Sequence, residues 1–171
     1  MKTIIMLGIG FAMSITTVRA QTNVTAEFDV AEALFRHQFQ HNASAVQTNA
    51  AAYFLSIRGQ DPDPVFLKRF DGNTPPVKMK SEHGMNKKGV VVDPKSGRHA
   101  LIFKIEGITM KSSDEAIVCG GYGEGPMSAS GNTYILKKEN GKWVVTSDKM
   151  RWISKTDTEP ANPGYRASRS A

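Results

Sequence analysis

The strongest constraint on the fold is a two-residue turn near the end of the chain. Asn140 and Gly141 separate two runs of β-forming residues, 133–138 and 143–145. Both turn residues tolerate the positive φ angles of a type I′ turn, whose twist matches that of the strands it joins. The sequence therefore predicts a β-hairpin here, with 148–154 continuing the second strand past a bulge.

Further β-forming runs precede this hairpin. The proline and glycine of 93–97 favour a tight turn, so we expect the runs on either side of it to pair as a second hairpin. Alternation within the run after the turn places Leu101, Phe103 and Ile105 on one face. The expected strands cover residues 53–57, 77–81, 89–92, 99–105 and 115–122.

Two helices are expected in the first half of the chain. The longer one covers residues 25–41, where apolar side chains recur at spacings of three and four and therefore share one face. The shorter one covers residues 64–70, because Asp63 can cap it and Pro64 suits its first turn. The side chains of the apolar face are Phe28, Ala31, Phe35 and Phe39.

The order of these elements predicts the fold class. Helices first and strands later indicate an α+β fold, in which the long helix packs on a curved antiparallel sheet of five to six strands, with one extra short helix. We expect one domain over 21–154 and a disordered tail over 155–171, where little can be buried. Trp143 is expected in the core beside the helix. Cys119 is expected there too, as a small apolar side chain.

The N-terminus resembles a secretory signal peptide. Lys2 supplies the positive start, 4–15 is apolar, and 18–20 offer a cleavage site before Gln21. The apolar stretch is shorter than the roughly 20 residues that span a bilayer, and no later segment is apolar enough to do so. We therefore expect an exported protein, periplasmic or secreted, with no integral membrane segment after residues 1–20 are removed.

The net charge of the chain limits the kinds of partner that we expect. The whole chain carries +6, and removal of residues 1–20 would leave +4, which is mild for a nucleic-acid-binding domain. We therefore expect no nucleic-acid partner. A lysine cluster favours either a solvated loop or attraction to an anionic envelope polymer. The cluster consists of Lys78, Lys80, Lys87 and Lys88.

A long helix followed by strands that end in 141–145 resembles small exported bacterial domains of the cystatin-like or NTF2-like superfold. The segment 128–134, together with the hairpin after it, is similar to bacterial domains of unknown function. The element order matches over 28–154 and the residues over 120–145. This resemblance implies a curved sheet with a helix across it. It implies no activity, because such folds host enzymes, ligand cups and interaction modules alike.

Two histidines are the candidate catalytic residues. His37 and His41 stand four residues apart on the long helix, so they can face one site. A metal would need a third ligand such as His83, His99 or a carboxylate, and no zinc-binding motif is present; we expect no metal and no cofactor. One alternative is a general base working with Asp148 in a cup, and the other is that both histidines are bystanders.

The glycine-rich segment 120–126 supplies the candidate contact residues. Its glycines favour a bulge or a flexible connection over a phosphate-binding loop, because no helix follows them. Loops often carry the function of a sheet scaffold. We therefore take Tyr122, Glu124 and Met127 as candidate ligand or partner contacts, with Tyr122 at a pocket mouth.

Three functions remain after these arguments. The first is a non-enzymatic exported module that binds a small ligand or an envelope protein or polymer. The second is an NTF2-like enzyme that uses a helix histidine and a carboxylate in a cup. The third is a secreted enzyme inhibitor that acts through 120–131. A concave pocket with a histidine beside a carboxylate favours the enzyme, and a filled core with a flat exposed sheet favours binding.

Overall fold

The computed structural model describes residues 16–42, 44–47 and 49–154 of the protein. Residues 1–15 of the predicted signal peptide and the predicted tail 155–171 lie outside the described residues. The first helix, α1 (Thr16–Gln40), runs through the predicted cleavage point. Within 24–40, the part of α1 whose side chains are described, the first buried residue is Val30. The part of α1 that packs in the core therefore belongs to the predicted mature chain.

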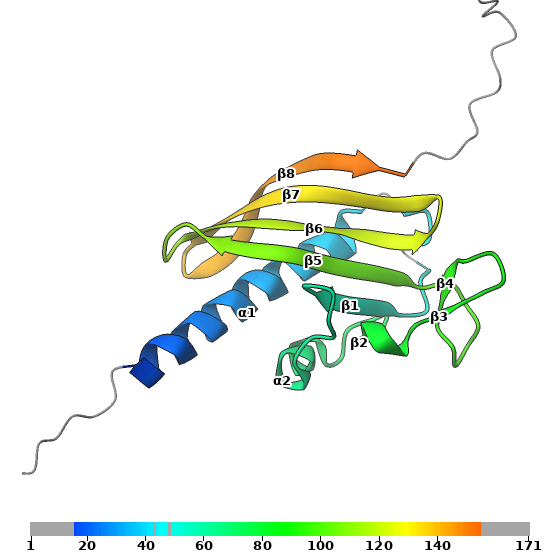
Figure 1. The fold of residues 1–171 in the computed structure, drawn as a ribbon, viewed down its shortest axis with the longest axis horizontal. Coiled ribbons are helices and arrows are strands. Elements are labelled where there is room, and N and C mark those ends of the chain that lie inside the picture. Colours follow the sequence, from blue (N-terminus) through cyan, green and yellow to red (C-terminus); the bar gives the residue numbers. More distant parts are fainter. Residues whose placement is uncertain (1–15, 43, 48, 155–171) are drawn as a thin grey trace, which may run out of the picture.

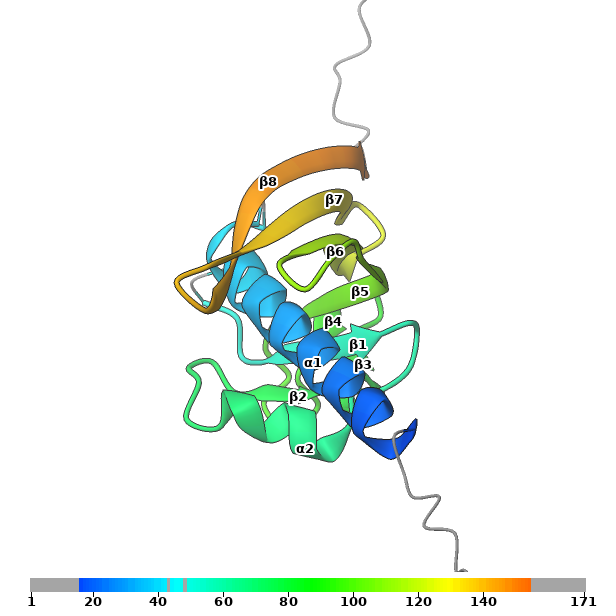
Figure 2. The same ribbon diagram turned by 90° about the vertical axis from the view of Figure 1, so that its left-hand side faces the viewer.

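Helix α1 crosses one face of a six-stranded sheet, and strands β7 and β8 bend around it (Figures 1 and 2). The sheet order is β2-β1-β5-β6-β7-β8. Its strands are β1 (Tyr53–Ile57), β2 (Val77–Met79), β5 (Leu101–Met110), β6 (Glu115–Gly125), β7 (Ser128–Glu139) and β8 (Lys142–Ile153). The other elements are α2 (Pro64–Leu67), the 3₁₀ turns η1 (Lys68–Phe70) and η2 (Lys80–Glu82), and the two-stranded ribbon of β3 (Gly84–Met85) and β4 (Val91–Val92).

The sheet is mixed, which corrects the prediction of an antiparallel sheet. Strands β5 to β8 are antiparallel neighbours, but β1 runs parallel to both β2 and β5. Parallel neighbours need a crossover connection. The segment with α2 and η1 makes that crossover between β1 and β2. The short predicted helix over 64–70 is confirmed, with the Asp63 carboxylate accepting from the backbone N–H of Val65 at 2.7 Å.

The predicted second hairpin is present only as its turn and one antiparallel bridge, between Val92 and His99. Strand β4 otherwise pairs with β3. The following strand instead pairs with β1, from Tyr53 opposite Leu101 onward. This pairing brings the apolar face of β5 under α1, where Leu101 and Phe103 are fully buried. Because β5 has β1 on one edge and β6 on the other, β4 cannot pair along it beyond the turn.

The last hairpin is confirmed. Asn140 and Gly141 have φ angles of 50° and 79°, and Glu139 lies opposite Lys142 across the turn. Strand β8 continues past register shifts to Ile153, as predicted. The glycine-rich segment contains the predicted irregularity, since the pairing of β6 with β7 shifts register between Gly123 and Gly125. Residues 120–125 and 128–131 otherwise belong to β6 and β7, so 120–131 is not one loop.

The core lies between α1 and the sheet. All four residues of the predicted apolar face pack there, and Trp143 is buried in the same cluster. The buried face of α1 is wider than predicted, since Val30 and Leu34 are fully buried as well. Cys119 is half-exposed, because β6 turns its neighbour Val118 inward; the core placement was wrong. No helix in the described part of the chain has the length and apolarity to cross a bilayer.

Candidate functional site

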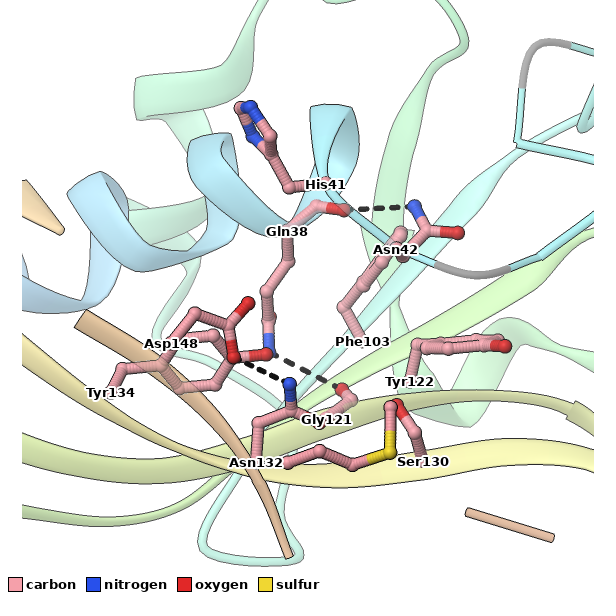
Figure 3. Close-up of a pocket in the computed structure, with 11 residues that line it drawn as sticks. Gln38, His41, Asn42, Phe103, Gly121, Tyr122, Ser130, Asn132, Tyr134 and Asp148 are labelled. Atoms are coloured by element: carbon pink, nitrogen blue, oxygen red, sulfur yellow. Dashed lines mark hydrogen bonds between the residues drawn. The ribbon is translucent and has the colours of Figure 1, made fainter. Parts of the chain in front are cut away.

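A cavity of about 240 Å³ lies where α1 ends above the inner face of β5 to β8 (Figure 3). Strand β7 presents Ser130, Asn132 and Tyr134 on this face because alternate residues of a strand share one side. The same side continues with buried Leu136 under the middle of α1. The inner face is therefore apolar under the middle of α1 and polar beneath its last turn. The side chains with polar groups at the cavity include Gln38, His41, Tyr122, Asn132, Tyr134 and Asp148.

Gln38 is the most deeply buried polar side chain of the cavity, with 1% of its surface exposed. Its amide reaches from α1 toward the strands (Figure 3). There Nε2 donates to the hydroxyl of Tyr134 at 3.3 Å and to the carbonyl of Gly121 at 3.5 Å, while Oε1 has no hydrogen-bond partner. A Cβ on Gly120 would stand 3.3 Å from Nε2, so glycine leaves room for this amide.

Asn132 and Asp148 form a second polar pair across β7 and β8. The Asn132 Nδ2 donates to Oδ1 of Asp148 at 2.5 Å, and the Asn132 Oδ1 is buried without a partner. The other carboxylate oxygen of Asp148 lies 3.6 Å from Nε2 of His37. Burial raises the pKa of the neighbouring Tyr134 to about 12, so this hydroxyl remains protonated at neutral pH.

The two histidines stack on each other with their ring centroids 4.4 Å apart. His41 is exposed, and its Nδ1 lies 3.0 Å from the carbonyl oxygen of His37. His37 is half-buried and stands edge-on to Tyr134. Burial and, secondarily, the neighbouring His41 lower the pKa of His37, while Asp148 opposes this shift. His37 is therefore mainly neutral at pH 7.

Strands β7 and β8 curl around the helix and bring Tyr134 and Asp148 against His37, whereas His41 is exposed. The described residues hold no group of three histidine, cysteine or acidic side chains positioned for a metal. Of the other candidate ligands, His83 lies beside Phe54 and His99 lines a separate hollow, so neither lines this cavity.

The three predicted contact residues do not form one site. Tyr122 is 4% exposed and lines the cavity under α1, where burial raises the pKa of its hydroxyl. Glu124 and Met127 line a separate, more apolar hollow of about 490 Å³ beside His99. The Glu124 carboxylate there accepts a hydrogen bond from the hydroxyl of Ser44. The three candidate contacts are therefore divided between two hollows, and their role in binding stays a prediction.

Comparison of the chain with protein-family models, curated proteins and solved structures finds no match. The resemblance to the cystatin-like or NTF2-like superfold therefore stays a prediction, and the functional argument rests on the site itself.

Proposed function

We propose that this protein is a binding domain that holds a small polar ligand in the cup between the last turns of α1 and the inner face of β5 to β8. A volume of about 240 Å³ lies below the roughly 300–1,000 Å³ of pockets for drug-sized molecules, so the ligand would be small. The predicted signal peptide supports the further proposal that the protein acts after export, in the periplasm or outside the cell.

The observation that supports this proposal most strongly is the unpartnered oxygen of Gln38. Leaving a buried polar group without a hydrogen bond costs about 1–3 kcal/mol, so such groups are rare without a reason. Among the described residues, the buried side-chain atoms without a partner are His37 Nε2, Gln38 Oε1 and Asn132 Oδ1. All three belong to side chains at or beside this one cavity. A bound molecule with hydrogen-bonding groups would satisfy them.

A second candidate function is an enzyme that uses His37 as a general base. The 3.6 Å between His37 Nε2 and Asp148 Oδ2 supports it, because catalytic hydrogen bonds are often long before the substrate binds. A neutral imidazole can accept a proton, the carboxylate would orient the ring, and the Tyr134 hydroxyl could donate to the substrate. In this alternative the ligand of the cup is consumed.

The binding proposal is tested by nuclear magnetic resonance of the ¹⁵N-labelled protein. The probes are butylamine, 1-butanol, butyrate and glycerol, which together offer ammonium, hydroxyl and carboxylate groups. We expect at least one probe to shift the backbone amides of 38–42, 130–134 and 148–150, and we expect Gln38→Leu to abolish this response. The absence of any response in the wild-type protein would contradict the proposal. Chemical conversion of a bound probe, lost in His37→Gln, would favour the enzyme.

A further inference from the structure

We propose that the ligand of the cup is a small primary amine, bound through its ammonium group by the carbonyl oxygens of Gln38 and Asn132 and by the carboxylate of Asp148. This inference rests on the proposed function, because it names the class of ligand for the same site. The orientation of the two amides, the charge of the site and the shape of its walls all favour such a ligand.

The orientation of both amides is set by their partners. The backbone carbonyl of Gly121 can only accept a hydrogen bond, so the Gln38 nitrogen must face it. The ionised carboxylate of Asp148 likewise only accepts, so the Asn132 nitrogen must face that group. The atoms left without partners are therefore Gln38 Oε1 and Asn132 Oδ1. Both are acceptors, and the missing group must supply donors.

The charge of the site favours a cation. The groups that face His37 are His41 on its own helix, Tyr134 on β7 and Asp148 on β8. Burial lowers the pKa of His37, so this ring carries little positive charge at neutral pH, and the Tyr134 hydroxyl is not cationic in either protonation state. The guanidinium of Arg151, which follows on β8, is paired with Glu106 at 2.5 Å. Among the described residues, Asp148 therefore has no lysine or arginine partner.

A primary ammonium group matches this arrangement in its number of hydrogen-bond donors and in the sign of its charge. It carries three donors and no acceptor, and the cup offers two amide oxygens and one carboxylate. Hydrogen bonds between charged groups are about twice as strong as neutral ones. A neutral alcohol could occupy the oxygens but would leave Asp148 without a counter-charge, and a carboxylate ligand would be repelled.

The remaining walls restrict the rest of the molecule. Phe103, Tyr122 and Met150 line the cavity beside the polar groups and present ring and thioether surface. A short carbon skeleton attached to the ammonium group would fit against them within about 240 Å³. The ligand class is therefore a primary amine with a few carbon atoms.

The test compares three probes that share one four-carbon skeleton: butylamine, 1-butanol and butyrate. Isothermal titration of the wild-type protein at pH 7.5 should show binding of butylamine at least about tenfold tighter than of either other probe. Asp148→Asn should weaken butylamine binding about tenfold or more. The matched control Asp114→Asn, which alters an exposed carboxylate in the turn between β5 and β6, should leave it unchanged. Acidification below pH 6 should also weaken binding, because a protonated His37 would stand beside Asp148.

The outcomes separate this inference from the proposed function. If 1-butanol, butyrate or glycerol binds in the cup and butylamine does not, the amine inference is overturned and the binding function stands. If no probe binds, the amine inference and the proposed binding function are both contradicted. If Asp148→Asn fails to fold, the relative affinities of the three probes for the wild-type protein still test whether the ligand is an amine.

Discussion

A methyl group added at Gly120 tests both the packing of the sheet and the shape of the cup. A Cβ atom on Gly120 would lie 2.5 Å from the carbonyl oxygen of Lys104 on β5 and 3.3 Å from Nε2 of Gln38. The carbonyl is backbone in the middle of the sheet, so it can move only if β5 and β6 separate locally. We therefore expect Gly120→Ala to destabilise the fold and to displace the Gln38 amide.

The magnitude follows from two opposing effects. Overpacking of this kind costs about 1–3 kcal/mol, and a contact with backbone belongs at the upper end. Replacing glycine restricts the unfolded chain and returns about 0.5–1 kcal/mol. The net loss in the free energy of unfolding is then about 2 kcal/mol, which lowers the melting temperature by roughly 5–10 °C in a domain of this size.

The assay is thermal and urea unfolding followed by circular dichroism, with Gly107→Ala as the matched control. A Cβ on Gly107, also in the sheet, would meet nothing within 4 Å, so this variant should unfold like the wild type or slightly later. Equal melting temperatures for Gly120→Ala and Gly107→Ala would refute the reasoning about the close contact between β5 and β6.

Three further predictions follow from the core, the histidines and the N-terminus. Trp143→Ala and Phe35→Ala should each lower the free energy of unfolding by about 3–5 kcal/mol; unchanged urea midpoints would show that the buried face is misplaced. The pKa of His37 is lowered from 6.5 in the folded state, so the unfolded chain binds a proton on this ring more readily than the folded protein does. The free energy of unfolding should therefore fall as pH drops from about 7 toward 5. His37→Gln should flatten this slope, and an equally steep slope in that variant would assign it to other groups. Mass spectrometry of protein from its native host should find a chain beginning at or near Gln21, and an intact Met1 on functional protein would disprove export by cleavage.

Local signals predicted the parts of the fold that depend on local chemistry. The turn at Asn140 and Gly141 is set by the φ angles that these two residues tolerate, and the helix cap at Asp63 by one side-chain oxygen. The parallel pairing of β1 with β5 depends on contacts between segments about fifty residues apart. The turn at 93–97 carried a clear local signal and is formed, but β5 has β1 on one edge and β6 on the other, so no edge of β5 is left for β4.

The candidate site was predicted in part for the same reason. His37 and Asp148 were named together from residue chemistry, and they lie 3.6 Å apart. Gln38 was missed because a glutamine in a helix ordinarily faces solvent. A signal was present, since Gln38 lies four residues after buried Leu34 and seven after Ala31, at the spacing of one helical face. The spacing of Asn132 and Tyr134, two residues apart in one strand, likewise indicated that they share a face of the sheet.

The central claim is that Gln38 is buried to serve a ligand, and one measurement tests it most directly. The melting temperature of the wild-type protein and of Gln38→Leu is recorded with and without butylamine, 1-butanol, butyrate or glycerol at saturating concentration. A ligand of the folded state stabilises it by mass action, so at least one probe should raise the melting temperature of the wild type. Without a probe, the free energy of unfolding of Gln38→Leu should lie within about 1 kcal/mol of the wild-type value, because the change removes an unsatisfied oxygen together with two long hydrogen bonds. No probe should raise the melting temperature of this variant. An equal shift in both proteins, or a shift in neither, would contradict the account.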